Sequence, residues 1–309
     1  EKRSNYQALG LNKKILSKKI DIRNFNKLKK IFKKNNPDFV FHLAAQSLVK
    51  KSYDAPMLTF NTNSIGTLNL LESLRFMKKK CVIVVITSDK SYKNLELNRG
   101  YNEEDLLGGV DPYSASKACA ELVIKSYFNS FLKKNKNLKI AVARAGNVIG
   151  GGDWSQNRLV PDCIKSWVKN KSVVIRNPRS TRPWQHVLEV LSGYLILALK
   201  LQKNSKINGE AFNFGPKNFQ NKSVINLIQE IKKGLPNFKW KIKHTKNFYE
   251  SKLLKLNSQK AKKKLKWSNK LSFKQTIRMT TVWYKNFYSK KINMLNLSSS
   301  QIFDYEKKL

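Results

Sequence analysis

Two side chains that could perform proton transfer stand four residues apart in Tyr113-Ser114-Ala115-Ser116-Lys117. On a helix this spacing places both on one face. A nearby ammonium favours the phenolate and is expected to lower the pKa of Tyr113 below its usual value of about 10. Tyr113 could then take a proton from a hydroxyl group while the same carbon gives up a hydride to a nicotinamide. Taken alone, the pair is better explained as an exposed helical pair, because this spacing often arises by chance in a lysine-rich chain.

A second polar group, Thr87-Ser88-Asp89-Lys90, directly follows the apolar run at residues 81–86. Open α/β sheets bind ligands at the carboxyl ends of their strands. A hydroxyl, a carboxylate and an ammonium are well placed for reaction chemistry there. The alternative is a polar turn in which Ser88 or Asp89 caps local backbone groups.

Short apolar strands alternate with amphipathic helices, which indicates an α/β fold with a doubly wound, Rossmann-type parallel sheet covered on both faces. We predict a dinucleotide-binding domain over residues 1–152, with later returns near 187–215, and a smaller, mostly helical substrate-binding lobe over 153–309. Predicted strands cover residues 39–43, 81–86, 139–143 and 211–214, and predicted helices cover 25–34, 57–75, 113–132, 159–168, 187–201 and 224–233.

The start of the predicted domain departs from the usual pattern. A doubly wound domain begins with a strand, a glycine-rich turn and a helix that holds the pyrophosphate. Gly10 is the sole glycine before residue 39, and residues 19–22 resemble a later strand of the same half. We expect the sequence to start after the first βαβ unit, so that this unit is missing. The alternative is a lineage that lacks the loop.

Composition excludes several classes of protein. The net charge is +41, but only ten of the 61 basic residues are arginine and the lysines are spread along the whole chain. This distribution indicates a general lysine bias and no specific nucleic-acid partner. Apolar runs fall far short of the ~20 residues of a membrane span. We expect no secretory signal at the N-terminus. Cys81, Cys119 and Cys163 show no disulfide or zinc spacing, so we also expect reduced thiols, no metal and a cytoplasmic location.

Several segments together carry a family resemblance: His42-Leu43-Ala44-Ala45-Gln46, Asn63-Ser64-Ile65-Gly66-Thr67, Ser88, the Tyr113/Lys117 pair and Arg144-Ala145-Gly146-Asn147-Val148. In this order they resemble the extended short-chain dehydrogenase/reductase family. The resemblance runs from about Lys19 to the C-terminus. It implies an enzyme that uses NAD on a small-molecule nucleotide-sugar substrate.

Within that family, Ser88-Asp89-Lys90 resembles the Thr-Asp-Glu set of sugar-nucleotide 4,6-dehydratases, with Lys90 in place of Glu. Together with residues 150–154 and 177–187, it is similar to the CDP-glucose 4,6-dehydratase branch. The resemblance implies that Tyr113, helped by Lys117 and Ser88, deprotonates the C4 hydroxyl as hydride passes to NAD. Lys90 then removes the C5 proton while Asp89 protonates the departing C6 hydroxyl.

The resemblance also implies binding residues. Asp21, Ile22, Leu43, Ala44 and Ala45 would contact the cofactor together with Tyr113 and Lys117. Gln46, Asn147, Arg158 and Arg182 would contact the substrate, the arginines through its diphosphate. Each arginine could instead be surface charge, and Asp21 could cap a helix.

Relatives commonly form homodimers through the two long helices, here residues 57–75 and 113–132, so we expect a homodimer. The alternative functions are another nucleotide-sugar 4,6-dehydratase, a 4-epimerase of the same family, or a basic nucleic-acid-binding protein without enzymatic activity. A chain without the glycine-rich loop could also be inert.

Overall fold

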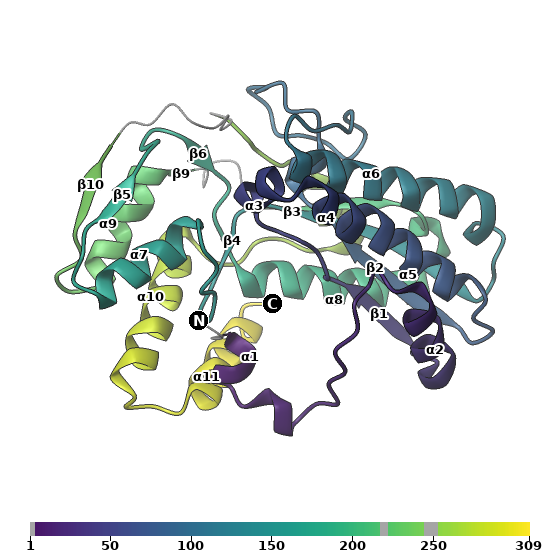
Figure 1. Ribbon diagram of the computed structural model, residues 1–309, viewed down its shortest axis with the longest axis horizontal. Coiled ribbons are helices and arrows are strands. Elements are labelled where there is room, and N and C mark those ends of the chain that lie inside the picture. The colour runs from purple at the N-terminus through teal and green to yellow at the C-terminus, as the bar shows by residue number, and fades with distance from the viewer. Residues whose placement is uncertain (1–3, 217–221, 244–252) are drawn as a thin grey trace.

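The larger lobe is built on one parallel sheet (Figure 1). In the computed structural model, which describes residues 4–216, 222–243 and 253–309, the sheet contains β1 (Phe39–His42), β2 (Cys81–Ile86), β3 (Leu138–Ala145) and β8 (Ala211–Phe214), in that order. All three pairings are parallel, so the four strands end at one edge. The predicted parallel α/β sheet is confirmed.

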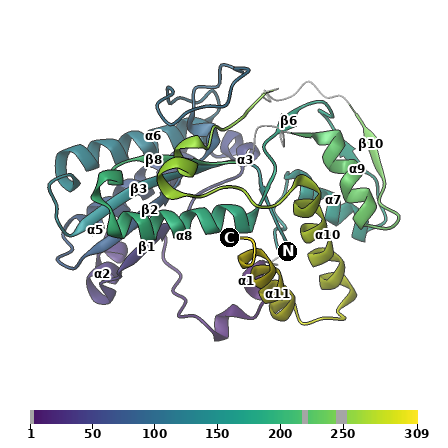
Figure 2. The ribbon, with the colours of Figure 1, turned by 180° about the vertical axis from the view of Figure 1, so that it is seen from behind.

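Helices cover both faces of this sheet. Cys81, Ile83 and Val85 face α5 (Gly66–Arg75) and α6 (Pro112–Tyr127), whereas Val82 and Val84 face α8 (Val187–Lys203). Figure 2 shows α8 on the side of the sheet away from α5 and α6. Burial on both faces explains why every residue of β2 is apolar.

Two predicted helices each contain a π-helical turn. The segment predicted at 57–75 is α4 (Pro56–Phe60), the π turn η2 (Asn61–Ile65) and α5. The segment predicted at 113–132 is α6 followed by the π turn η4 (Phe128–Leu132). Such wide turns recur near functional sites.

The strand expected at residues 19–22 is absent, which corrects the sequence prediction. The Asp21 carboxylate accepts a hydrogen bond from the Arg23 backbone N–H at 2.9 Å, which makes a turn. Asn69 Nδ2 then donates to the Ile22 carbonyl at 3.1 Å and ties this turn to α5. The next helix, α2 (Phe25–Asn35), begins after it.

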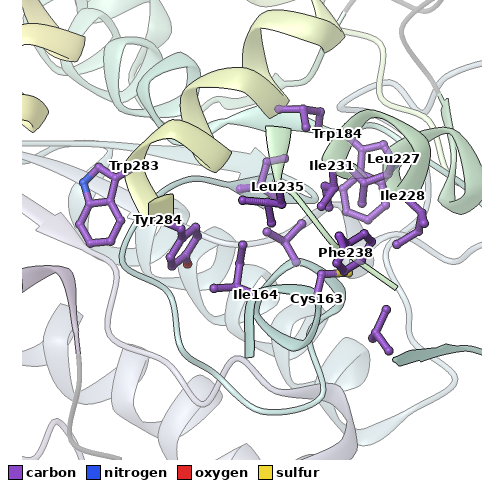
Figure 3. Close-up of a cluster of buried hydrophobic side chains, with 14 of the residues drawn as sticks. Cys163, Ile164, Trp184, Leu227, Ile228, Ile231, Leu235, Phe238, Trp283 and Tyr284 are labelled. Carbon is purple, nitrogen blue, oxygen red and sulfur yellow. The ribbon is translucent and has the colours of Figure 1, made fainter. Parts of the chain in front are cut away.

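The smaller lobe is mostly helical. It contains α7 (Leu159–Val168), α9 (Val224–Gly234), α10 (Phe273–Ser289) and α11 (Met294–Glu306). Two strand pairs complete it: β5 (Val173–Ile175) with β10 (Trp240–Ile242), and β6 (Thr181–Arg182) with β9 (Lys222–Ser223). Figure 3 shows its apolar core, in which Cys163, Ile164 and Leu227 are fully buried.

The N-terminal helix α1 (Asn5–Ala8) packs with the smaller lobe. The Asn5 backbone N–H donates to the Gly152 carbonyl at 3.0 Å, and Ala8 and Leu9 pack against the core of this lobe. Residues 5–9 therefore lie apart from the sheet, although the sequence prediction assigned residues 1–152 to the dinucleotide-binding domain.

Short elements connect the rest of the chain. They are η1 (Leu11–Lys13), α3 (Val49–Asp54), η3 (Asp89–Ser91), β4 (Val148–Ile149), β7 (Gln185–His186), η5 (Ser205–Ile207) and η7 (Ala261–Leu265). Within the described ranges, no helix is both long and apolar enough to cross a membrane. In the same ranges, no three His, Cys, Asp or Glu side chains gather into a metal-binding group.

Candidate active site

The loop after β2 forms one wall of the candidate site. Ser88 caps the short helix η3, because its Oγ accepts a hydrogen bond from the Lys90 backbone N–H at 3.2 Å. The same hydroxyl donates to Asp89 Oδ1 at 3.0 Å. Ser88 and Asp89 are 6% and 3% exposed, and Lys90 is partly buried beside them. Backbone capping, the alternative considered for this segment, therefore occurs, and it fixes the orientation of the Ser88 hydroxyl.

Asp89 is a buried acid with one unused oxygen. Its Oδ2 has no hydrogen-bond partner among the described residues. Burial raises the pKa of Asp89, and the positive charges of Lys90 and Arg182 only partly oppose this. The carboxylate lies against Gly146, where a Cβ would come within 1.8 Å of Oδ2. A side chain at position 146 would therefore displace the acid.

Helix α6 brings Tyr113 to this loop. Tyr113 is 8% exposed, and its hydroxyl lies close enough to Ser88 for the two to influence each other. Burial raises the pKa of Tyr113, while the Ser88 hydroxyl and the positive charge of Arg158 lower it. The expectation of a lowered pKa for Tyr113 is wrong for this structure, because the cost of burying a phenolate outweighs the favourable contacts.

Lys117 lies one turn further along α6 and is 7% exposed. Its Nζ donates to the Ile86 carbonyl at 3.4 Å, at the end of β2. Burial lowers the pKa of Lys117 to about 8, and the negative charge of Glu121 opposes that change. The ammonium is therefore held at the carboxyl edge of the sheet with donors to spare.

The end of β1 offers an apolar surface at the same edge. Leu43 and Ala44 are exposed, and Ala45 is half-buried. Gln46 is buried, and its amide bonds within the protein: Nε2 donates to Thr59 Oγ1 at 2.9 Å, and Oε1 accepts from the backbone of Leu48 at 2.7 Å. A substrate contact through Gln46 stays a prediction and would require these bonds to rearrange.

The three remaining residues predicted to bind substrate lie near the loop. Arg158 Nη2 donates to Ser47 Oγ at 2.8 Å, and Nη1 donates to Asp153 Oδ2 at 3.3 Å. Arg182 is buried and close enough for its charge to lower the pKa of Asp89. Asn147 directly follows Gly146, with a left-handed φ of 48°. The fold therefore places Asn147 and Arg182 near the Asp89 carboxyl, whereas Arg158 lies near enough to Tyr113 for its charge to lower the pKa of that phenol.

Asp21 and Ile22 lie along the start of α5. The exposed Asp21 carboxylate pairs with Arg23, which lowers its pKa to about 2. Ile22 packs so closely on Gly66 that a Cβ at Gly66 would lie 2.6 Å from Ile22 Cδ1. Gly66 comes one turn after Asn63, whose Oδ1 accepts from the Gln46 backbone N–H at 2.8 Å. A cofactor role for Asp21 and Ile22 stays a prediction.

Residues 2–280 match the model of the GDP-mannose 4,6 dehydratase family. The chain belongs to this family. It is 40% identical over 290 residues to the CDP-glucose 4,6-dehydratase of Salmonella typhimurium, which covers 92% of this chain and 80% of that protein. The predicted family is confirmed.

Solved structures show the same fold. The UDP-glucose 4-epimerase of Thermotoga maritima superimposes with a TM-score of 0.80 at 23% identity, covering 90% of this chain and 87% of that one. The dTDP-glucose 4,6-dehydratase of Bacillus anthracis, solved in complex with NAD, gives a TM-score of 0.72 at 22% identity, covering 87% and 79%.

This member of the dehydratase family also has a buried ion pair that was not predicted as part of the site. Glu121 and Arg144 are each 4% exposed, and Arg144 Nε donates to Glu121 Oε1 at 2.8 Å. The signal was present in the sequence: Glu121 is the single acid of its helix, four residues after Lys117, and Arg144 directly follows the apolar run at residues 140–143.

Proposed function

We propose that the chain converts CDP-glucose to CDP-4-dehydro-6-deoxyglucose with bound NAD+, a dehydration without net oxidation. The observation that carries this proposal is the buried Asp89 carboxyl, which has a raised pKa and lies in the same loop as the hydroxyl that contacts Tyr113. An oxidation or epimerisation at C4 needs the base, whereas a dehydration also needs an acid. The 40% identity to a CDP-glucose 4,6-dehydratase supports the substrate.

The residues present fit the nicotinamide end of NAD. Leu43 and Ala44 offer an exposed apolar surface, and the Lys117 ammonium has donors for ribose hydroxyls. Among the described residues, Gly10 is the sole glycine before β1, and it lies between α1 and η1, away from the sheet. We therefore assign to these residues the nicotinamide and its ribose, with Asp21 and Ile22 beside the adenine.

The reaction needs three proton transfers, from the C4 hydroxyl, from C5 and to the departing C6 hydroxyl, and then the return of a proton to C5. Bound NAD+ supplies the hydride acceptor for C4 and the donor for C6. Tyr113 takes the proton of the C4 hydroxyl, with Ser88 stabilising the phenolate. The resulting ketone acidifies the C5 proton, which Lys90 removes as the neutral amine and returns to C5 when hydride reaches C6. Asp89 holds its proton to higher pH than an ordinary aspartic acid and gives it to the C6 hydroxyl, which leaves as water.

Substrate binding uses the polar groups beside Asp89 and Tyr113. Arg158 and Arg182 match the oxygens of a diphosphate, and Asn147 supplies an amide donor. Arg158 contacts both Ser47 and Asp153, so a phosphate bound there would rest against both lobes.

Product analysis after incubation with CDP-glucose and NAD+ tests the proposal. We expect a 4-keto-6-deoxy product from the unaltered chain, and a fall of at least about 10²-fold in Asp89→Asn and Lys90→Met. In heavy water, Asp89→Asn should still introduce deuterium at C5 of recovered substrate, because Lys90 remains as the base. Lys90→Met should not. An unaltered chain that yields only a 4-epimer, or no product, contradicts the proposal.

We also propose a homodimer through α4, η2, α5 and α6. Met57, Ile65 and Leu122 are exposed apolar side chains on these adjoining helices. Ile65→Lys with Leu122→Lys should halve the molar mass measured by light scattering. Leu199→Lys, at an exposed position on α8 across the sheet, should leave it unchanged. A monomeric unaltered chain would rule the dimer out.

Three cysteines, Cys81, Cys119 and Cys163, are free thiols, which supports a reducing compartment. We propose the cytoplasm.

A further inference from the structure

The Glu121 carboxylate gathers hydrogen-bond donors from three separate segments. Its Oε1 accepts from Thr87 Oγ1 at 2.7 Å and from Arg144 Nε at 2.8 Å. Ser91 Oγ lies 2.9 Å from the same oxygen and 2.6 Å from the Ser88 carbonyl, so its proton serves one or the other. One buried oxygen therefore joins α6, β3 and both ends of the loop after β2.

The arginine in this cluster is itself fixed. Arg144 Nη1 donates to Tyr92 OH at 2.7 Å and to the Glu103 carbonyl at 2.9 Å. The guanidinium also lies over the Tyr92 ring, 4.7 Å from its centroid. Glu121 is consequently bound to a rigid partner and has little freedom to follow the loop.

The residues held in place are those that the proposed chemistry requires. Thr87 and Ser91 flank the segment 88–90, which carries the Ser88 hydroxyl, the Asp89 acid and the Lys90 amine. On the opposite wall, Tyr113, Lys117 and Glu121 recur every four residues and so share one face of α6. Glu121 thus connects the helix that carries the base to the loop that carries the acid.

We propose that Glu121 is a positioning residue: through Thr87 and Ser91 it sets the position of Ser88 and Asp89 relative to Tyr113. This inference rests on the proposed function for its effect on turnover. A carboxylate is required because it only accepts hydrogen bonds, and Oε1 faces several donors at once. A neutral amide would turn its own N–H groups toward some of them.

Glu121→Gln tests the charge, but it leaves Arg144 buried without a counter-ion and can prevent folding. The double variant Thr87→Val with Ser91→Ala keeps the ion pair and removes only the links to the loop. For this variant we expect kcat to fall by about 10- to 100-fold, with KM for CDP-glucose within about threefold. The backbone N–H at position 91 bonds the Ser88 carbonyl, and its hydrogen exchange, relative to the intrinsic rate of the residue present, should speed up by about tenfold or more.

Thr280→Val with Ser73→Ala is the matched control. Both hydroxyls are buried and donate to a carbonyl of their own helix, at 2.9 and 2.6 Å. The control should keep kcat and the exchange rate of Ser91. A double loop variant with unaltered kcat and unaltered exchange would overturn the inference. If the unaltered chain does not turn over CDP-glucose, the proposed function fails, and the exchange measurement alone decides whether Glu121 orders the loop.

Discussion

Tyr113→Phe should lower turnover of CDP-glucose by about 10³-fold while the protein keeps its fold. The change removes one oxygen, the atom that takes the C4 proton and contacts Ser88. A phenylalanine ring fills the same buried space on α6. We therefore expect the loss of the hydroxyl to change the free energy of unfolding little. Steady-state kinetics with CDP-glucose, alongside thermal unfolding, measures both parts of this expectation.

Tyr194→Phe provides the matched control. Tyr194 is a buried tyrosine on α8 that packs edge-on against Phe214, with ring centroids 5.7 Å apart. Removing its hydroxyl should change turnover by less than about threefold. Equal losses in the two variants would mean that Tyr113 acts through packing and would refute its role as the base.

Lys117→Met should abolish most activity and stabilise the fold. Loss of the ammonium removes a charge beside the proton-transfer site and should cost about 10²-fold or more in kcat. Burial lowers the pKa of Lys117 from 10.5 to about 8, so the folded state carries a cost for the charged form. Each tenfold change in an acid constant is worth about 1.4 kcal/mol, so removing this charge should raise the free energy of unfolding by about 3 kcal/mol at neutral pH.

The size of the stability effect depends on pH. Below about pH 8, Lys117 is charged in both states, and the whole cost falls on the folded protein. Between about 8 and 10.5 the folded protein releases the proton first, so the advantage of Lys117→Met should shrink and then vanish. Urea unfolding at pH 7 and near pH 10 measures this. Lys125→Met, at an exposed position on the same helix, should show neither effect, and a pH-independent gain would refute burial as the cause.

Local patterns predicted most of the sheet. The strands at 81–86 and 211–214 have the predicted bounds because each is an apolar run between polar turns. Helix α7 likewise begins and ends as predicted. The sequence placed Ser88 and Asp89 at the carboxyl end of a strand and Tyr113 and Lys117 on one helix face, and the structure brings Lys117 to the end of that strand. A sequence directly shows which side chains share a helix face and which residues follow the end of a strand.

The properties that the sequence did not predict depend on three-dimensional surroundings. The pKa of Tyr113 depends on how much water burial removes, which spacing from Lys117 does not reveal. The strand expected at 19–22 needs a neighbouring strand to pair with, and the Asp21 carboxylate makes a turn instead. The link between Glu121 and Thr87 joins residues 34 positions apart. A hydrogen bond of this kind forms only when α6 packs against the end of β2.

The contact between Asp89 and Gly146 has a consequence for protein engineering. The Asp89 carboxyl occupies the volume that the side chain of any other residue at 146 would need, so the two positions have to be substituted together. A dehydratase loop transplanted into a related sheet would seat its acid only if a glycine were transplanted with it at the end of the adjacent strand. An aspartate at position 89 thus requires that the residue at position 146 has no Cβ atom.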